Sequence, residues 1–274
     1  MPGSEQVRVN AAAWRRGDHV GEYANRTLLP VEVMILVRYR EALAGRTLEV
    51  GCGAGRILGY LAAIGEAHGI DISAAMVEHC RHRYPAAHAE VADLGDLGDA
   101  AAGPFDAILA LDNVLDVFDD EQRRRVLADL RARVAPGGLL IFSSHNLAYV
   151  DRPAATKQAA SAGGWRRGRE LLAKAAARPP ASAIRDARRI PRRIANRRRL
   201  EALQRRGPGY AIVNDSAHDY GLLHYYIGRD DQQRQLAETG FELLECLDVD
   251  GGRVGAGEPH PDPWLHYIAR PVKS

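Results

Sequence analysis

Cysteines and long apolar runs are both scarce in this chain of 274 residues. The three cysteines, Cys52, Cys80 and Cys246, lack the paired spacing of a zinc site or a disulfide framework, so we expect buried, reduced thiols. No stretch approaches the roughly 18 consecutive apolar residues that a membrane span needs, and residues 1–10 have no hydrophobic core for a signal peptide. These absences predict a cytoplasmic protein with no membrane partner.

Charge is balanced overall but polarised along the chain, whose formal net charge is +2. Between Asp151 and Arg206, fifteen arginines and two lysines accompany four acidic residues, a net charge of +13 that leaves −11 for the remainder. We therefore expect an acidic globular body with a basic appendage. The length suits one large α/β domain with a sizeable insertion.

From Thr47 to Ser144, short β-branched runs alternate with helical patterns, which is typical of strand–helix–strand units in a parallel sheet. Ser73 is expected to cap a helix that Pro85 ends, and Asp119 to cap the helix that follows. The predicted strands are Thr47–Val50, Ala67–Ile70, Ala89–Ala92, Ala107–Leu111 and Leu139–Ser143.

A glycine turn, LEVGCGAGR at residues 48–56, directly follows the first predicted strand. Such a turn before a helix puts backbone N–H groups at the carboxyl edge of a sheet, where ligands of these folds bind. The dinucleotide fingerprint G-x-G-x-x-G, counted from Gly51, would need glycine where Arg56 stands. Glu49, just before the turn, suits a cationic amino-acid group better than a pyrophosphate. The pattern favours S-adenosylmethionine over NAD.

Taken in order, LEVGCGAGR, GIDIS, EVADL, FDAILALDNVL and VAPGGLLIF resemble the motifs of the class I S-adenosylmethionine-dependent methyltransferases. The resemblance covers roughly residues 47–144 and, more loosely, 222–270. It implies an α/β, Rossmann-like class I methyltransferase fold, with a mostly parallel seven-stranded sheet, an antiparallel last strand and, here, an inserted helical lid. It also implies S-adenosyl-L-methionine as cofactor and S-adenosyl-L-homocysteine as product.

On this interpretation the chain has four segments: an N-terminal helical cap (1–46), the S-adenosylmethionine-binding core (47–150), an arginine-rich helical insertion (151–209) and the C-terminal part of the sheet (210–274). We expect the insertion to be helices broken at Pro179-Pro180 and at Pro191, with Ile190 and Ile194 among the positions that pack on the domain. It would lie over the mouth of the active site.

The resemblance also implies roles for single residues. Glu49 and the glycine turn would hold the methionine part, Asp71 would accept hydrogen bonds from the ribose hydroxyls, and Asp93 one from the adenine amine. Strand-end caps are the alternative for these two aspartates, and a helix cap for Asp112 and its neighbour. The expected cofactor-binding residues are Tyr23, Arg26, Glu49, Gly51, Cys52, Gly53, Gly55, Asp71, Ile72, Met76, Asp93, Leu94, Leu111, Asp112 and Asn113.

Methyl transfer from a sulfonium is an in-line displacement, so the protein must position a nucleophile and, for a hydroxyl, remove its proton. His145, directly after the fifth predicted strand, is the first candidate base, His218 is the second, and Tyr226 completes the candidate catalytic set. An ordinary hydrogen-bonded role is the alternative for each histidine. The expected substrate-binding residues are Asn146, Asp219, Tyr220, His224 and Tyr225.

Two further features of the C-terminal part constrain the site. In a strand, His224 and Tyr226 share one face while Tyr225 points to the other, so only one of these sets can face a cavity. No metal site is expected, because the histidines of HPDPWLH at residues 260–266 stand in a proline-rich loop without a partner cluster.

These observations predict a methyltransferase acting on an oxygen or nitrogen of a small-molecule acceptor, such as a sugar, a glycan or a secondary metabolite. The acceptor would be anionic if the arginines bind it. Two alternatives stay open: a nucleic-acid methyltransferase that uses the insertion, which the single Trp165 among the basic residues disfavours, and a non-catalytic cofactor-binding scaffold. A second copy of the chain, forming a homodimer, also stays open as a partner.

Overall fold

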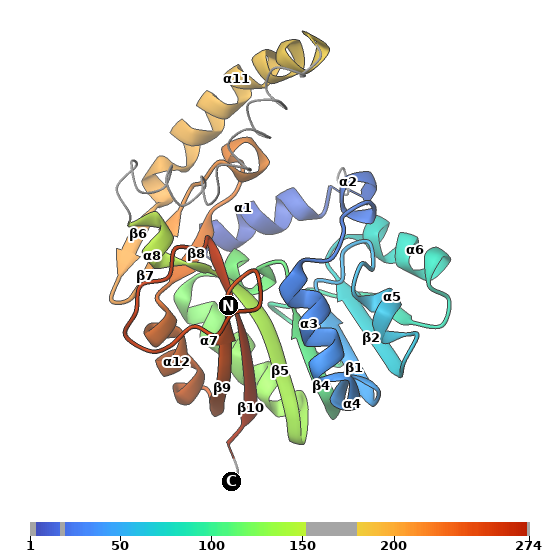
Figure 1. Cartoon of the computed structure of the whole chain (residues 1–274). Coiled ribbons are helices and arrows are strands. Elements are labelled where there is room, and N and C mark those ends of the chain that lie inside the picture. Colours follow the sequence, from blue (N-terminus) through green and yellow to red (C-terminus); the bar gives the residue numbers. More distant parts are fainter. Residues whose placement is uncertain (1–3, 17–19, 152–179, 273–274) are drawn as a thin grey trace.

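The computed structural model describes residues 4–16, 20–151 and 180–272, in which helices cover both faces of one central sheet (Figure 1). The helices are α1 (Glu5–Trp14), α2 (Val20–Ala24), α3 (Pro30–Arg38), α4 (Arg40–Leu43), α5 (Leu58–Leu61), α6 (Ala74–Arg83), η1 (Val114–Val117), α7 (Asp120–Arg133), α8 (Leu147–Val150), α11 (Pro180–Leu200), η2 (Glu201–Leu203), η3 (Ala217–Tyr220) and α12 (Arg229–Glu238). The strands are β1 (Arg46–Val50), β2 (Glu66–Asp71), β3 (His88–Val91), β4 (Phe105–Ala110), β5 (Val134–Asn146), β6 (Arg205–Gly207), β7 (Tyr210–Val213), β8 (His224–Ile227), β9 (Phe241–Leu247) and β10 (Trp264–Pro271).

The core of the sheet has the order β3-β2-β1-β4-β5-β10-β9. The first five of these strands are parallel, and β10 is antiparallel to both of its neighbours. This arrangement confirms the predicted fold and all five strands predicted between Thr47 and Ser143. Strand β5 is longer than expected, since it begins at Val134 and includes the Pro136-Gly137-Gly138 stretch.

Three short strands extend this sheet beyond the predicted seven. Strand β8 is parallel to only the last two residues of β5, through the pairs His145–Tyr226 and Asn146–Ile227. Strand β7 then pairs antiparallel with β8, and β6 with β7. The extension therefore adds a second wall at the carboxyl end of β5, and it places residues 205–207 in a strand where helix was expected.

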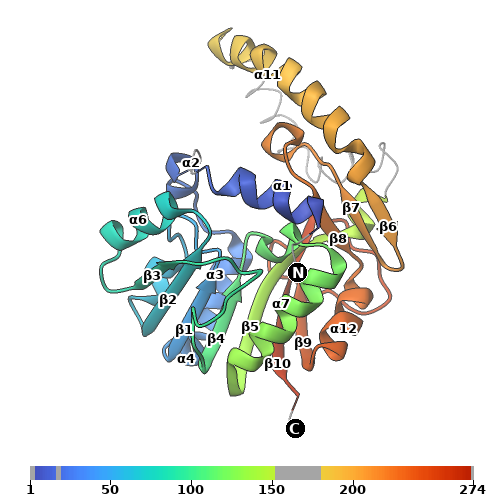
Figure 2. The same cartoon turned by 180° about the vertical axis from the view of Figure 1, so that it is seen from behind.

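Both faces of the parallel strands are buried, which explains why these strands read as nearly continuous apolar runs. In β4, Ala107 and Leu109 join the core beneath α3, while Ile108 and Ala110 join the core beneath α7. Helix α3 lies toward the viewer in Figure 1 and α7 in Figure 2, on opposite faces of the sheet.

Two chemical expectations about the chain can be compared with this fold. The three cysteines are free and buried, as predicted. Among the described helices, none is long and apolar enough to cross a membrane.

Of the two predicted helix caps, the one at Asp119 is confirmed and the one at Ser73 is not. The Asp119 carboxylate accepts a hydrogen bond from the Gln122 N–H at 2.9 Å, which confirms the cap of α7. Ser73 precedes α6, but its side chain makes no capping bond. The Ser73 N–H instead donates to Asp71 Oδ1 at 2.8 Å, so the carboxylate at the end of β2 orders the start of this helix.

Helix α1 lies within the expected N-terminal helical cap, but its inward face is polar rather than apolar. Gln6 and Asn10, one helical turn apart, are buried. Asn10 Nδ2 donates to the carbonyls of Val117 and Leu223, at 2.8 and 2.7 Å, and Asn10 Oδ1 accepts from the Leu223 N–H at 3.1 Å. One amide therefore fastens α1 to both η1 and the segment before β8, across the end of the sheet (Figure 1).

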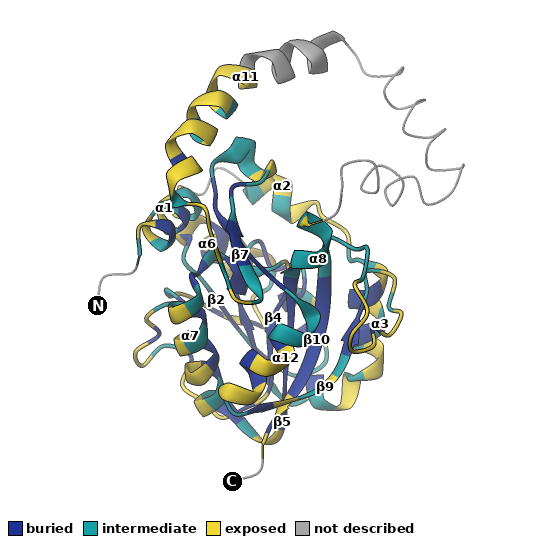
Figure 3. Ribbon diagram, turned by 90° about the vertical axis from the view of Figure 1, so that its left-hand side faces the viewer, coloured by how far each residue is buried: buried dark blue, intermediate teal, exposed yellow. Residues whose placement is uncertain are grey.

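The described part of the insertion departs from the predicted pattern. Helix α11 runs through Pro191 without a break, and it projects from the body with most of its described surface exposed (Figure 3). Ile190 and Ile194 are about half exposed, so their predicted packing on the domain is wrong. The first half of the predicted insertion, with Trp165 and Pro179, lies outside the described residues.

We expect Asn10→Ala to lower the free energy of unfolding by about 2–3 kcal/mol, because three buried backbone groups lose their partner. Urea denaturation followed by circular dichroism measures this loss. Asn25→Ala is the matched control, because the Asn25 amide donates to the Gly21 carbonyl at an exposed position. Equal destabilisation by the two variants would contradict the role of Asn10 in holding α1.

Candidate active site

A cavity of about 340 Å³ lies at the carboxyl ends of β1, β2, β4 and β5. All of the predicted cofactor-binding residues except Gly55 line it, together with His145, His218 and His224. Helix α1 and η3 contribute the opposite wall, through residues such as Trp14 and Ala217. Among the described residues, α1 and η3 rather than α11 cover the cavity.

The glycines of the turn have different reasons to be glycine. Gly53 has a φ of +52°, and a Cβ built there would find only the Tyr23 ring within 4 Å, so its backbone is open to the cavity. At Gly51 a Cβ would approach the Val114 side chain to 2.5 Å, and at Gly55 it would approach the Tyr84 ring to 2.7 Å. Gly55 therefore permits close packing of the turn, while Gly53 offers backbone to a ligand.

Glu49 carries an unsatisfied group into this cavity. Its side chain is buried, and its Oε2 atom has no hydrogen-bond partner within the described residues. Burial raises the pKa of Glu49 well above its usual range. A bound cation would satisfy the carboxylate and favour its ionised form.

Asp71 orders the glycine turn and the start of α6, and it also lines the cavity. Its Oδ2 accepts from the Gly53 N–H at 2.9 Å, and its Oδ1 accepts from the Ser73 N–H. Burial raises the pKa of this carboxyl group. Each carboxylate oxygen has a second lone pair, so the structural role leaves capacity for hydroxyl donors.

Asp93 joins the N-terminal segment to the same wall. Its Oδ1 accepts from the Gly95 N–H at 2.9 Å, and its Oδ2 pairs with Arg15, just after α1, at 3.0 Å. This exposed ion pair contributes little stability, but it sets the end of α1 beside the cavity.

The predicted pair Tyr23 and Arg26 lines the cavity from the other side. The Arg26 guanidinium lies 3.9 Å from the Tyr23 ring centroid and pairs with Asp112 Oδ2 at 2.8 Å. Burial raises the pKa of Tyr23 to about 12, so its phenol stays protonated. Asp112 and Asn113 have φ values of +58° and +61°, a left-handed conformation that Asp and Asn tolerate best after glycine.

His145 is held by an aspartate that the sequence did not single out. Its Nδ1 lies 2.7 Å from Asp116 Oδ2, which also accepts from the His145 backbone N–H at 2.6 Å. Since an ionised carboxylate can only accept, a neutral His145 carries its proton on Nδ1 and keeps a lone pair on Nε2. Nε2 is 3.4 Å from the Asn113 amide at the edge of the cavity.

Asp116 is itself buried in an ion pair. Its Oδ1 accepts from Arg123 Nη1 at 2.5 Å and from Ser144 Oγ at 2.7 Å. Burial opposes its ionisation, but the Arg123 charge and the hydrogen bonds from His145 outweigh that effect and hold the pKa of Asp116 below its usual range. Arg123 is completely buried, and Gln232 and Gln235 of α12 and Ser144 of β5 accept its other hydrogen bonds.

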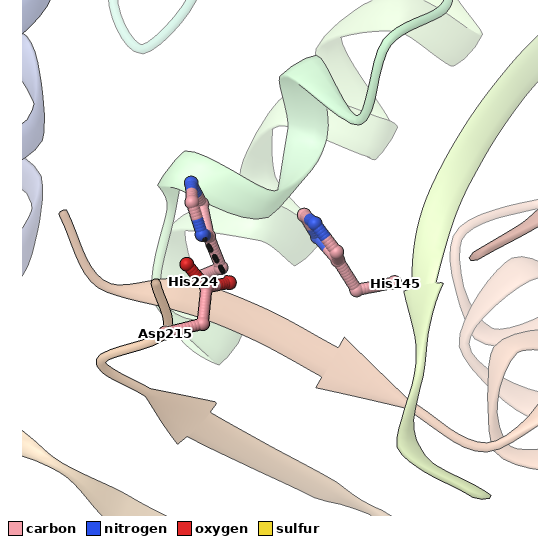
Figure 4. Close-up of side chains that lie close together, drawn as sticks. All are labelled: His145, Asp215 and His224. Atoms are coloured by element: carbon pink, nitrogen blue, oxygen red, sulfur yellow. Dashed lines mark hydrogen bonds and ion pairs between the residues drawn. The ribbon is translucent and has the colours of Figure 1, made fainter. Parts of the chain in front are cut away.

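A second histidine–aspartate pair stands beside the first. His224 Nδ1 lies 2.7 Å from Asp215 Oδ2, and Tyr226 Oη donates to the same oxygen at 2.7 Å. Burial opposes the ionisation of Asp215, but the hydrogen bonds from these two residues outweigh it and hold the pKa of Asp215 below its usual range. Figure 4 shows the rings of His145 and His224 side by side, with Asp215 on the His224 side.

The remaining predicted substrate residues lie away from the cavity. Asn146 donates to the carbonyls of His260 and Asp262, both at 2.9 Å, and Tyr225 donates to Asp120 on the far face of β8. The face shared by His224 and Tyr226 is thus the inner one, although Tyr226 does not itself line the cavity.

His218, Asp219 and Tyr220 form a turn of three consecutive left-handed residues, with φ from +49° to +60°. Such a turn is strained and needs outside support. Helix α11 supplies it, since Arg193 pairs with Asp219 at 2.8 Å and Asn196 Nδ2 donates to the Asp219 carbonyl at 3.0 Å. The turn carries His218 into the cavity wall and leaves the predicted residues Asp219 and Tyr220 outside it.

Several residues of the site were not predicted from the sequence. Trp14, Trp264 and Arg56 also line the cavity. The Arg56 guanidinium forms a bidentate ion pair with the buried Glu32. Asp116 was missed because nothing in its local pattern distinguishes it from other loop acids. The one available signal was its place shortly after β4, near the edge where ligands bind.

Residues 47–138 match the sequence model of a family described as a methyltransferase domain. The O-methyltransferase cnsE of Penicillium expansum is 35% identical over 117 residues, which are 39% of this chain and 40% of that protein. The match therefore spans less than half the length of this relative.

Solved structures agree along nearly the whole chain. The CcbJ methyltransferase from Streptomyces caelestis has a TM-score of 0.60 at 14% identity, with 97% of this chain and 99% of that chain covered. The DhpI–SAM–HEP complex has a TM-score of 0.56 at 17% identity, with 99% and 100% covered. The glycopeptide N-methyltransferase MtfA, complexed with S-adenosylmethionine, has a TM-score of 0.53 at 14% identity, with 89% and 95% covered. Residues 47–138 thus resemble the methyltransferase domain family, and the described residues share the class I methyltransferase fold of these solved structures.

Proposed function

We propose that this protein is an S-adenosylmethionine-dependent methyltransferase that acts on a hydroxyl oxygen of a small-molecule acceptor. The observation that carries the proposal is the position of His145. A buried ionised aspartate fixes its Nδ1, its ring lines the cavity, and the same cavity is lined by the glycine turn and Glu49.

The residues present fit the cofactor. The unpartnered Oε2 of Glu49 would accept from the ammonium group, the open backbone at Gly53 would admit the methionine part, and the carboxylate of Asp71 would accept from the ribose hydroxyls. Asp93 and Leu94 would contact the adenine. When bound, the cofactor supplies an electrophilic methyl group on a positively charged sulfur.

His145 supports transfer to oxygen because its Nε2 can take the proton that a hydroxyl must lose. The acceptor oxygen forms the new bond to the methyl carbon as the carbon–sulfur bond breaks, and the sulfur keeps that electron pair in S-adenosylhomocysteine. Asp116 acts as a positioning residue that fixes the tautomer and stabilises the imidazolium. The match to an O-methyltransferase supports the same choice of atom.

A small acceptor is favoured over nucleic acid by how the arginines are used. Arg193 pairs with Asp219, Arg205 with Asp119 and Arg206 with Asp151, at 2.8, 3.7 and 2.7 Å. These arginines serve the chain's own acidic groups. The cavity is also covered by α1, which suits a compact acceptor.

Glu49→Gln should weaken S-adenosylmethionine binding at least about tenfold, because the ammonium loses a charged acceptor. Binding of 5′-methylthioadenosine, which has no amino-acid part, should not change. Calorimetric titration measures both, with the exposed Glu78→Gln as control. Equal losses for the two ligands would contradict the assignment of Glu49.

The same variant should change how stability depends on pH. A carboxyl group whose folded pKa is raised costs stability as pH rises above its unfolded value, near 4.3 for glutamate. Without ligand, Glu49→Gln and the wild type should melt together near pH 4, and the variant should melt a few degrees higher at pH 8. A melting difference that stays constant with pH would refute a buried, protonated Glu49.

Asp71→Asn should weaken S-adenosylmethionine, S-adenosylhomocysteine and 5′-methylthioadenosine alike, by about 10- to 100-fold, because all three contain the ribose. This common loss distinguishes Asp71 from Glu49. Asp129→Asn, at an exposed position of α7, is the control in the same titrations. Unchanged affinity would remove the ribose assignment.

His145→Ala should leave S-adenosylmethionine affinity nearly intact and lower turnover by about 10²- to 10⁴-fold, the usual contribution of a general base. The assay is S-adenosylhomocysteine release, by mass spectrometry, with a panel of phenols, catechols and polyols. His82→Ala, on the exposed surface of α6, should be fully active. A fully active His145→Ala would assign proton removal to another group.

A further inference from the structure

The pair of His224 and Asp215 has no part in the proton transfer assigned to His145. Its hydrogen bonds are nonetheless as fully formed as those of His145 and Asp116. Asp215 is surrounded by three donors, since its Oδ2 accepts from His224 and Tyr226, and its Oδ1 accepts from the Ala217 N–H at 2.9 Å. His224 is buried and lines the same cavity as His145.

The two histidines present the same chemistry to the cavity. In each, Nδ1 lies 2.7 Å from a carboxylate oxygen of an aspartate whose pKa is held low. Each neutral ring therefore carries its proton on Nδ1 and keeps an acceptor lone pair on Nε2. The ring centroids are 4.9 Å apart, with 27° between the ring planes. Two similar hydrogen-bond acceptors thus stand side by side, from β5 and β8 (Figure 4).

We infer that the acceptor carries two hydroxyl groups on neighbouring carbon atoms, one for each histidine. This inference rests on the proposed function. The first hydroxyl gives its proton to His145 Nε2 while its oxygen takes the methyl group. The second hydroxyl donates a hydrogen bond to His224 Nε2 and is not methylated, so the product is a mono-methyl ether.

A single acceptor hydroxyl would leave His224 Nε2 without a donor when the cavity closes on its ligand. Burying an unpaired acceptor costs about 1–3 kcal/mol, and a site built to bind a hydroxyl rejects the analogue that lacks it. The His224 imidazole therefore favours an acceptor that has a second hydroxyl group.

The neighbouring side chains favour a flat ring between the two hydroxyls. Trp14 packs edge-on against Tyr23 and His218, at centroid distances of 5.8 and 4.8 Å, and all three line the cavity. Trp264 lines it as the β10 residue paired with His145. An aromatic vicinal diol, a catechol, is accordingly the simplest probe of the inference.

A metal ion is the rival occupant, because ligand atoms of His145, Asp215 and His224 lie within 4.8 Å of one another. Asp215 is poorly placed as a third ligand, since its two oxygens already accept three hydrogen bonds. Two imidazole nitrogens would remain, fewer than the three protein ligands of a catalytic zinc site. The hydroxyl pair matches the observed donors and acceptors better, and zinc becomes an outcome of the test.

The test measures binding of catechol, guaiacol and phenol to the protein saturated with S-adenosylhomocysteine, in EDTA, by ligand-observed NMR titration. In the wild type, catechol should bind about tenfold more tightly than phenol or guaiacol, as expected for one added hydrogen bond. In His224→Phe, which keeps an aromatic ring but loses Nε2, the three affinities should become equal. His260→Phe, at a histidine outside the cavity, should keep the preference for catechol.

A second measurement needs no variant, so it tests the inference even if His224→Phe does not fold. In wild-type protein labelled with ¹⁵N-histidine, catechol should shift the Nε2 signals of both His145 and His224, while phenol should shift only one. Equal affinities of the three probes in the wild type would overturn the inference, as would a catechol preference that appears only with added zinc. Failure to bind S-adenosylhomocysteine would instead sink the proposed function. Normal cofactor binding without a catechol preference sinks only the inference.

Discussion

The buried ion pair between Asp116 and Arg123 is the interaction on which the site depends. Neither side chain is exposed, and the pair joins η1, α7, the end of β5 and α12 through Ser144, Gln232 and Gln235. A buried pair of this kind is costly to form, but removing one partner would leave an uncompensated charge in the core. The ion pair therefore favours one arrangement of these elements, the one in which both charges are satisfied.

The imidazole of His145 is oriented by this network. Asp116 uses one oxygen for Arg123 and Ser144, and the other for the backbone and ring of His145. The helix α7 that supplies Arg123 is fixed in turn by its Asp119 cap and its apolar face. Hydrophobic packing on one face of the sheet thus sets the tautomer of a histidine at its edge.

Local patterns sufficed to predict the parallel core and the glycine turn, and all of the expected cofactor-binding residues except Gly55 line the cavity. Those features depend on residues close together in sequence, as with the Gly53 N–H, which donates to Asp71 at the end of the next strand. The polar attachment of helix α1 escaped prediction because the partners of Asn10 lie more than one hundred residues away. Asp116 escaped for a similar reason, because a carboxylate is recognised as an orienting group only when its histidine has been brought beside it.

Part of the arginine-rich segment is used within the chain. The segment carries a net charge of +13, and three of its described arginines, Arg193, Arg205 and Arg206, pair with the chain's own acidic groups. The pairing of Arg193 with Asp219 supports the left-handed turn at residues 218–220, so part of the basic charge holds one wall of the cavity.

The two histidines stand on supports of different kinds. His145 lies near the end of β5, which pairs with β4, β10 and β8, whereas His224 on β8 is oriented by Asp215 from the loop between β7 and β8. On the proposed function, substitutions in that loop would change how His224 is held while Asp116 and Arg123 continue to hold His145. The two histidines can thereby be altered independently of one another.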